Sequence, residues 1–239
     1  MKTPPVALIT GASQGIGRAI AMKFAEAGYA MALAARRQDV LQNVAAQVGK
    51  SYNVPVLVAP TDLRKPEQIA GLVSRTIENF GKIDVLANNA GVLYVKPFLE
   101  ISAEEYREMM DVNLDAVFRL TQLALPHMIE QKSGAIVNIA SLAGKNAVRG
   151  GTAYAASKWA IRGFAASLML EVRHHGIRVI TVFPGSVDTP MLDNSPTPPR
   201  RETMLQPEDV AHAVYAAVSV PERAMISEID IRPSNPQKP

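Results

Sequence analysis

Two side chains that could exchange a proton stand four residues apart, at Tyr154 and Lys158 in the stretch Tyr-Ala-Ala-Ser-Lys. On a helix, residues at this spacing share a face, so the phenol and the ammonium can reach one cleft. A neighbouring ammonium favours the phenolate and lowers the pKa of a phenol from its reference value of ~10. The pair therefore predicts that Tyr154 gives or takes a proton near neutral pH. An ordinary pair on a helix surface has the same spacing, so other residues must decide.

A serine stands where it could support that proton transfer. Ser141 directly follows the apolar run 135–140 and precedes Tyr154 by thirteen residues, which leaves room for a loop across a cleft. Ligands of an open α/β sheet bind at the carboxyl ends of its strands, so the Ser141 hydroxyl could hydrogen-bond a substrate oxygen. The alternative is a serine that simply begins a loop. Ser141 has no G-x-S-x-G elbow around it, so a serine-hydrolase interpretation is poor.

An asparagine occupies the interior of a long predicted helix. Helical spacing of apolar residues runs from Ala103 to about Gln131, and Ser102 with Glu105 forms the sequence pattern of a capping box at its start. Asn113 lies inside this helix, although asparagine is a mediocre interior helix former. Either the amide has a functional reason to be there, or it is a hydrogen-bonded amide of the core.

These residues need a scaffold, and the sequence alternates short apolar runs with longer stretches of helical spacing. Strands this apolar are typical of a parallel sheet that helices cover on both faces. Gly28, Gly81 and Gly176 each precede the next run, where glycine suits the left-handed end of a helix. We expect one α/β domain over residues 1–239, a doubly wound Rossmann fold with a parallel sheet of about seven strands. The expected strands are Val6–Thr10, Met31–Ala35, Val56–Pro60, Ile83–Asn88, Ala135–Ala140, Ile177–Phe183 and Glu228–Arg232.

A glycine-rich turn, Thr-Gly-Ala-Ser-Gln-Gly-Ile-Gly at Thr10–Gly17, follows the first expected strand and opens the first helix. Glycines let the backbone approach a ligand, and a helix N-terminus offers free N–H groups to a pyrophosphate. A plain turn is the alternative, because loops are often rich in glycine. The position between strand and helix favours phosphate binding.

Two arginines, Arg36 and Arg37, follow the second expected strand, where a carboxylate would hold the ribose 2′-hydroxyl of NAD. Ala35 stands at the expected position of that acid, and no acidic residue lies between Glu26 and Asp39. Arginine can form charge-assisted bonds with the 2′-phosphate of NADP. The alternative, arginines that merely decorate a helix start, is disfavoured because cations gain nothing from the helix dipole there. The sequence therefore favours NADP(H).

Polar residues also close the third and fourth expected strands. A carboxylate at Asp62, next to Leu63, could meet an adenine amino group, and it could equally start a helix. Asn-Asn-Ala-Gly at 88–91 suits a ligand wall better than a core, although a tight turn would also explain an asparagine before a glycine.

Together these motifs resemble those of the short-chain dehydrogenases/reductases, in the family's order and spacing. The resemblance covers residues 6 to about 190. It rests on the glycine-rich turn, Asp62-Leu63, Asn88–Gly91, Asn113, Ser141, Tyr154–Lys158, and Pro184-Gly185 with Thr189.

The resemblance implies a role for each catalytic candidate. Tyr154 would be the general acid in carbonyl reduction and the general base in alcohol oxidation, and Ser141 would orient the substrate oxygen. Lys158 would lower the tyrosine pKa and hold the nicotinamide ribose. Asn113 would distort the long helix locally and fix a water in the proton relay. The family's chemistry needs no metal.

The resemblance also implies the contacts of an NADP(H) cofactor. The family's other common NADP marker, a basic residue before the second glycine, is replaced by Gln14, so NADP specificity rests mainly on Arg36. The expected contacts are Gly11, Ser13, Gln14, Gly15, Ile16 and Gly17 along the pyrophosphate and adenosine, Arg36 and Arg37 at the 2′-phosphate, Asp62 and Leu63 at the adenine, Asn89, Ala90 and Gly91 beside the cofactor, Tyr154 and Lys158 at the nicotinamide end, and Pro184, Gly185, Val187 and Thr189 at the carboxamide.

Composition narrows the class of protein. With 48% hydrophobic and 20% charged residues, the chain fits a globular protein rather than a disordered one. The net charge of +3 is scattered, which is unlike a nucleic-acid footprint. The absence of cysteine excludes disulfides and thiolate metal sites. No apolar run reaches the length of a membrane span and no signal peptide is evident, so we expect a cytoplasmic protein with no membrane partner.

The substrate is expected to be a small or medium carbonyl compound or alcohol. Its pocket should include Val92–Lys96, Leu142–Arg149 and a short proline-rich lid over residues 187–206, and a flexible tail is expected over 233–239. The ending 226–233 looks like that of reductases of small 3-hydroxy acids. A 3-oxoacyl-carrier-protein reductase is the alternative, with an acidic carrier docking near Lys132, Arg173 and His175; however, the glycine-rich C-terminus typical of those enzymes is missing.

Two other functions remain open. A catalytically silent NADP-binding sensor would usually lack one of the catalytic residues, and all four are present here. An NAD-linked epimerase or dehydratase of the extended branch fits poorly with this chain length and with Asn-Asn-Ala-Gly.

The resemblance also implies a homotetramer or dimer, because the family uses the helices that carry Asn113 and Tyr154 as a subunit interface.

Overall fold

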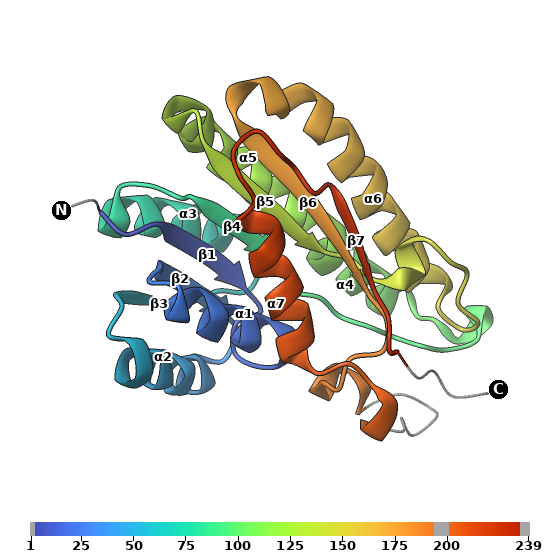
Figure 1. The fold of residues 1–239 in the computed structure, drawn as a ribbon. Coiled ribbons are helices and arrows are strands. Elements are labelled where there is room, and N and C mark those ends of the chain that lie inside the picture. The colour runs from blue at the N-terminus through green and yellow to red at the C-terminus, as the bar shows by residue number, and fades with distance from the viewer. Residues whose placement is uncertain (1–2, 194–200, 235–239) are drawn as a thin grey trace.

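The computed structural model describes residues 3–193 and 201–234, and these form a parallel sheet with helices on both faces (Figure 1). The sheet has seven strands in the order β3-β2-β1-β4-β5-β6-β7, and every neighbouring pair is parallel. The predicted fold class is confirmed. The strands are β1 Val6–Thr10, β2 Ala30–Ala35, β3 Val56–Pro60, β4 Val85–Asn88, β5 Gly134–Ile139, β6 Ile177–Pro184 and β7 Glu228–Ile231.

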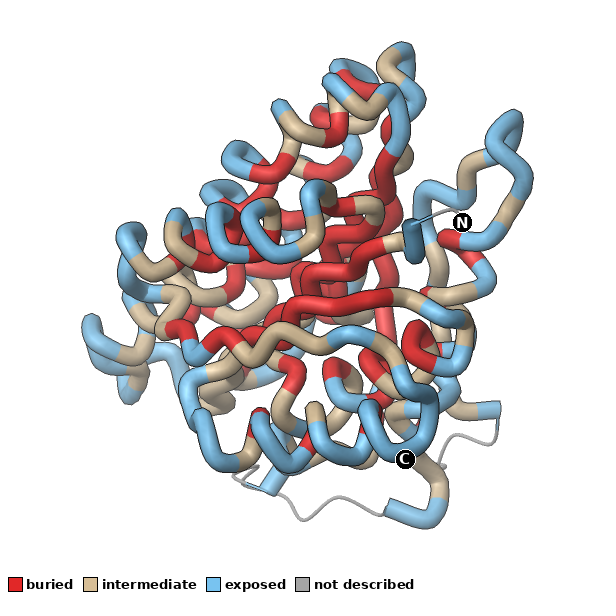
Figure 2. Tube along the Cα trace, turned by 90° about the vertical axis from the view of Figure 1, so that its left-hand side faces the viewer, coloured by how far each residue is buried: buried red, intermediate tan, exposed pale blue. Residues whose placement is uncertain are grey.

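Of the seven α-helices in the part of the chain that the structure describes, six cover the sheet in two layers, and α4 packs against the π-helical turn that follows it and against α6. One buried cluster joins α1, α2 and α7 to the sheet, and a second joins α3, α5 and α6 to the opposite face. Figure 2 shows the result, with the strands buried through the centre and exposed positions on the outer helix surfaces. The helices are α1 Gly15–Glu26, α2 Gln38–Tyr52, α3 Pro66–Phe80, α4 Ala103–Met110, α5 Ala116–Gln131, α6 Thr152–Val172 and α7 Pro207–Val218.

The long helix expected from Ala103 to Gln131 is interrupted. A π-helical turn over Asp111–Asp115 separates α4 from α5, and Asn113 lies within it. The distortion implied for Asn113 is therefore present. The predicted capping box also forms, because Ser102 Oγ accepts from the Glu105 backbone N–H while the Glu105 carboxylate accepts from that of Ser102.

The strand order places a ligand-binding edge at the centre of the sheet. The chain runs outward from β1 to β2 and β3, then returns to the other side of β1 with β4. Connections after β1 and β4 therefore leave toward opposite faces, and a crevice opens between them at the carboxyl ends of the strands. The predicted site residues lie at the carboxyl ends of the strands, in the segments that follow them, or on the helical segments beside this edge.

The expected lid is described in part. Val187 forms an isolated parallel bridge with Leu205, and short 3₁₀ helices cover Pro190–Leu192 and Arg201–Thr203. Residues 194–200 of the lid and 235–239 of the predicted flexible tail lie outside the described residues. Within the described ranges, no helix is long and apolar enough to cross a membrane.

Candidate active site

A cavity of about 1670 Å³ lies along the carboxyl edge of the sheet. Its walls come from the ends of strands β1 to β7 and from the segments that follow them, so residues far apart in sequence meet there. Gly17 and Asn113 are buried behind the wall. The other predicted site residues all line the cavity: Gly11, Ser13, Gln14, Gly15, Ile16, Arg36, Arg37, Asp62, Leu63, Asn89, Ala90, Gly91, Ser141, Tyr154, Lys158, Pro184, Gly185, Val187 and Thr189.

Glycines let the backbone of the glycine-rich turn come close to the cavity and to the start of α1. Gly11 and Gly15 adopt φ values of +64° and +53°, which favour glycine. A Cβ on Gly17 would lie 2.3 Å from the Gly11 carbonyl oxygen, so only glycine lets α1 start this close to the turn. The N-cap residue Gln14 makes no side-chain capping bond, which leaves the first N–H groups of α1 available to an anion. This turn fits a pyrophosphate.

Asn89 holds the glycine-rich turn against the end of β4. Its side-chain nitrogen donates to the carbonyls of Thr10 at 2.9 Å and Gly11 at 3.3 Å, and its backbone N–H donates to Thr10 Oγ1 at 3.0 Å. The two walls of the crevice are thus bonded directly to each other. Asn88 instead points into the core, where it bonds Asn138 at 2.9 Å.

At the far end of the cavity the cations predicted to meet a phosphate have protein partners. Arg37 donates to Gln14 Oε1 at 2.8 Å, and the Arg36 guanidinium lies 3.8 Å from the Glu108 carboxylate on α4. The sequence had suggested neither contact, because both depend on segments that only the fold brings together.

Asp62 does not start a helix. The helix-initiating interpretation is wrong, since α3 begins at Pro66 with Lys65 as its N-cap. The Asp62 carboxylate instead accepts hydrogen bonds from the Arg64 side chain, the shortest at 2.7 Å, and these bonds lower its pKa to about 2. Arg64 lines the cavity as well, although sequence reasoning did not single it out.

Asn113 ties the wall of the cavity to α6. Its Oδ1 accepts from the Val92 N–H at 2.8 Å, and its Nδ2 donates to the Val92 carbonyl at 3.0 Å and to Ser157 Oγ at 3.1 Å. Ser157 Oγ donates in turn to the Tyr154 carbonyl at 2.7 Å. The amide is therefore a hydrogen-bonded buried group, and its role in holding a water stays a prediction.

Ser141, Tyr154 and Lys158 meet on one wall of the cavity. Tyr154 lies in the first turn of α6 and Lys158 one turn later, as the spacing predicted. Ser141 caps the 3₁₀ turn Leu142–Gly144 by accepting from the Ala143 N–H at 3.1 Å, and its side chain also hydrogen-bonds Tyr154. Lys158 Nζ donates to the Ile139 carbonyl at 3.1 Å and lies 5.6 Å from the centre of the Tyr154 ring.

The prediction that Lys158 lowers the pKa of Tyr154 is wrong for the protein as described. Burial raises the pKa of the Tyr154 phenol, and its hydrogen bond with Ser141 only partly offsets that rise. Burial lowers the pKa of Lys158 to about 8, because the charged ammonium has lost water and gained only one carbonyl oxygen in exchange. The sequence showed the spacing of the pair but not its burial.

The substrate end of the cavity has mostly apolar walls. Val92, Leu93 and Val95 contribute from one expected segment, and Leu142, Ala143 and Val148 from the other. From the lid, Pro190, Met191, Leu192 and Met204 also line it, and Arg232 and Pro233 lie at its border. Among the described residues, no group of three or more His, Asp or Glu side chains could hold a metal ion.

Comparison with known proteins agrees with the family resemblance that the sequence motifs indicated. A family model described as short chain dehydrogenase matches residues 5–199. An uncharacterised oxidoreductase of Staphylococcus aureus is 36% identical over 231 residues, covering 97% of this chain and 98% of the relative.

Two solved structures are similar over nearly the whole chain. An alcohol dehydrogenase from the archaeon Thermococcus sibiricus, complexed with 5-hydroxy-NADP, has a TM-score of 0.90 and 33% identity, covering 98% of this chain and 99% of that one. A 3-ketoacyl-(acyl-carrier-protein) reductase from Brucella melitensis, complexed with NADH, has a TM-score of 0.86 and 27% identity, covering 96% and 97%.

Proposed function

This chain belongs to the short-chain dehydrogenase family and is an NAD(P)-dependent oxidoreductase, and from this premise we propose its cofactor, acid–base residue and substrate class. It transfers a hydride between NADP(H) and the carbonyl or hydroxyl carbon of a small or medium 3-hydroxy acid, ketone or aldehyde, with Tyr154 as general acid and base. The observation that carries this proposal is the meeting of Ser141, Tyr154 and Lys158 on the wall of a cavity whose other end holds Arg36.

The residues of this cavity fit a dinucleotide along its length. The open first turn of α1 and its glycines would hold the pyrophosphate, Arg36 the 2′-phosphate, and Asp62 with Leu63 the adenine. Gly185 and Thr189 also line the cavity, and the nicotinamide carboxamide would lie against them. The dinucleotide supplies the hydride when it is bound.

Tyr154 supplies the proton for the substrate oxygen in reduction and removes it in oxidation. Its raised pKa keeps the phenol protonated at neutral pH, which suits the acid of a carbonyl reduction. Ser141 donates to the same oxygen and so fixes its position and stabilises its developing charge. Lys158 Nζ lies 5.6 Å from the centre of the Tyr154 ring and also lines the cavity, where it would hold the nicotinamide ribose.

Arg36 is the reason to propose NADP(H) rather than NAD(H). It lies after β2 on the cavity wall, and its guanidinium is largely exposed there. The archaeal relative's complex with an NADP derivative supports this choice, whereas the Brucella reductase was complexed with NADH. Cofactor preference therefore has to be measured on this chain.

A 3-oxoacyl-carrier-protein reductase is the second candidate, favoured by the similarity to the Brucella enzyme. The positions of the suggested docking residues argue against this candidate. Lys132 precedes β5, and Arg173 and His175 precede β6, so all three lie at the amino edge of the sheet. The cavity opens at the carboxyl edge, about 20 Å away along strands of this length. A carrier bound at the amino edge would face away from the cavity.

The proposed function is tested by NADPH oxidation with acetoacetyl esters, 3-oxoacyl thioesters, aldehydes, quinones and keto sugars. We expect turnover with a small or medium ketone or aldehyde, and we expect Tyr154→Phe to bind NADPH as the wild type does but to lose nearly all turnover. Wild-type-like activity of the variant would overturn the role of Tyr154. Tight NADPH binding with no turnover across the panel would favour the non-catalytic sensor.

A further inference from the structure

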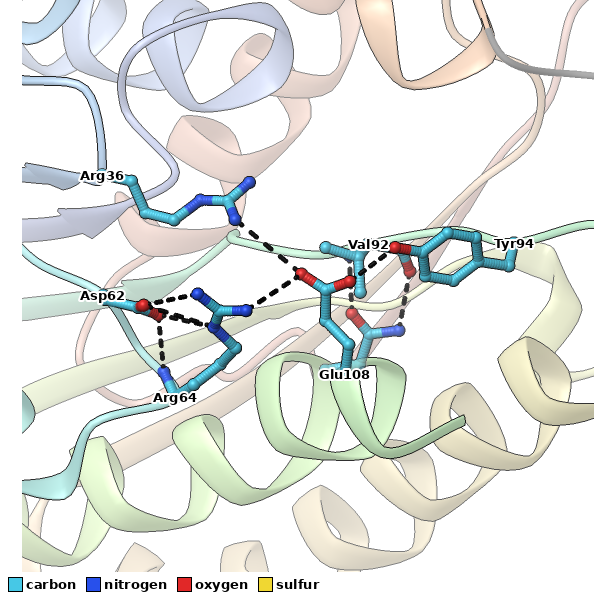
Figure 3. A network of polar contacts seen from close by, with 7 residues as sticks. Arg36, Asp62, Arg64, Val92, Tyr94 and Glu108 are labelled. Carbon is cyan, nitrogen blue, oxygen red and sulfur yellow. Dashed lines mark hydrogen bonds and ion pairs between the residues drawn. The ribbon is translucent and has the colours of Figure 1, made fainter. Parts of the chain in front are cut away.

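Glu108 connects the proposed 2′-phosphate site to the wall of the substrate pocket. Its carboxylate on α4 lies 3.8 Å from the Arg36 guanidinium and 3.7 Å from that of Arg64, and it accepts a hydrogen bond of 2.5 Å from the Tyr94 hydroxyl. Figure 3 shows both guanidinium groups directed at the carboxylate from one side and the tyrosine from the other. Nothing in the motifs of the sequence singles out Glu108.

The two arginines reach Glu108 from neighbouring strand ends. Arg36 follows β2 and Arg64 follows β3, and these strands are paired in the sheet. Both arginines line the cavity, whereas Glu108 does not and approaches from α4. An anion entering the adenosine end of the cavity would therefore find Glu108 already beside the same two guanidinium groups.

Arg36, Arg64, Asp62 and Glu108 form a network whose charges balance, while Arg37 at the same end of the cavity donates to the neutral Gln14. Arg64 is bonded to Asp62 through its Nε and one terminal nitrogen, and turns its other terminal nitrogen to Glu108. Arg36 has Glu108 as its ion-pair partner. The two cations thus face two carboxylates and carry no net surplus for a phosphate, which itself bears a charge of about −1.5 to −2 at neutral pH.

We propose that Glu108 determines cofactor specificity by competing with the 2′-phosphate of NADP(H) for Arg36 and Arg64. The inference rests on the proposed function, in which Arg36 faces that phosphate. The carboxylate weakens the attraction of both guanidinium groups for a second anion, and it does not affect NAD(H), which has none at that position. Tyr94 keeps the carboxylate in place, so it acts as a positioning residue.

The experiment compares two small ligands that differ only by the 2′-phosphate. The dissociation constants of adenosine 2′,5′-bisphosphate and of 5′-AMP are measured by calorimetry on the wild type and on Glu108→Gln. Replacing the carboxylate by an amide keeps its shape and its hydrogen bond from Tyr94 but removes its charge. We expect the preference for the bisphosphate to rise about threefold to tenfold, as for the loss of one or two partly exposed ion-pair partners. The rise should shrink at high ionic strength.

Glu105→Gln is the matched control. Glu105 is on the same helix and its loss changes the net charge equally, but its partner is Lys96 and not an arginine of the cavity. Glutamine also preserves the capping box. We expect the ligand preference of this variant to stay within about twofold of the wild type, because Glu105 pairs with Lys96 and has no ion pair with Arg36 or Arg64.

The outcomes separate the two proposals. An unchanged preference in Glu108→Gln, or an equal rise in Glu105→Gln, would overturn the role of Glu108. A wild type that binds both ligands equally would instead count against the proposed NADP(H) preference, whatever the variants do. If Glu108→Gln fails to fold by circular dichroism, Glu108→Ala gives the same comparison without the amide, and an unchanged preference there overturns the inference equally.

Discussion

At Tyr154 and Lys158, burial sets the protonation of both groups more than their proximity does. The phenol holds its proton more firmly than in water, and the ammonium releases its proton more easily. A buried cation that has only a carbonyl oxygen as partner costs stability wherever it is charged. Lys158, one of the proposed catalytic residues, therefore also lowers the stability of the fold.

This cost predicts that Lys158→Met is more stable than the wild type at pH 7. A pKa lowered from 10.5 to about 8 means that the charged Lys158 destabilises the fold by about 3 kcal/mol. Replacing it by methionine also removes its hydrogen bond to the Ile139 carbonyl, which offsets about 1 kcal/mol of the gain. We therefore expect the free energy of unfolding, measured by urea titration, to rise by roughly 1–3 kcal/mol. Lys50→Met, an exposed lysine on α2, should change it by less than about 0.5 kcal/mol.

The pH dependence of that difference gives a second test. Between pH 8 and 10.5 the unfolded wild type binds more protons at this site than the folded protein, so wild-type stability rises with pH across this window. The advantage of Lys158→Met should be full below pH 8 and should vanish toward pH 10.5. An advantage that stays constant over this range would contradict a lowered pKa of Lys158 in the folded protein.

At the scale of elements, one side chain joins the π turn between α4 and α5 to two other segments of the site. Asn113 bonds both backbone groups of Val92, so the segment that begins the substrate wall depends on it. The same amide reaches Ser157 and, through it, the first turn of α6. Three segments of the site thus share one set of hydrogen bonds.

Removing this amide should loosen the fold. In Asn113→Ala the N–H and carbonyl of the half-buried Val92 lose their partners, and each such group left unpaired costs roughly 1 kcal/mol or more. We expect the free energy of unfolding to fall by roughly 2–4 kcal/mol in a denaturant titration. Asn79→Ala removes an exposed side chain that only bonds the Arg75 carbonyl, and its effect should be small. Equal losses in the two variants would contradict this account.

The elements were largely predictable from sequence because the five inner strands, β1, β2, β4, β5 and β6, are buried on both faces. Their apolar runs mark them directly, and the structure moves their ends by only one or two residues. The π turn could be predicted only through the resemblance, since no helical periodicity signals an extra residue in a turn. Glu108 and Arg64 escaped prediction because their contacts join α4 to the ends of β2 and β3, which no local pattern encodes.

At the scale of the whole molecule, exposed apolar side chains gather on the helices expected to form an interface. Tyr106 on α4, Phe118 on α5, and Trp159 and Leu170 on α6 are each about half exposed or more. Such side chains on adjacent helices mark a surface for another protein chain. The expected homotetramer or dimer stays a prediction.

Light scattering at micromolar concentration tests it. We expect a mass of two or four chains for the wild type, and a shift toward smaller species in Trp159→Glu, because a carboxylate buried between subunits would be unpaired. Tyr52→Glu, on α2 and away from these helices, should leave the mass unchanged. A wild type that is monomeric under these conditions would contradict the expectation.

The separation of the two edges of the sheet has a practical consequence. Every segment that lines the cavity leaves from the carboxyl edge, whereas the exposed turn Arg173–His175 before β6 lies at the opposite edge. A fluorophore, an affinity tag or a surface for immobilisation attached at that turn would leave the cavity mouth open.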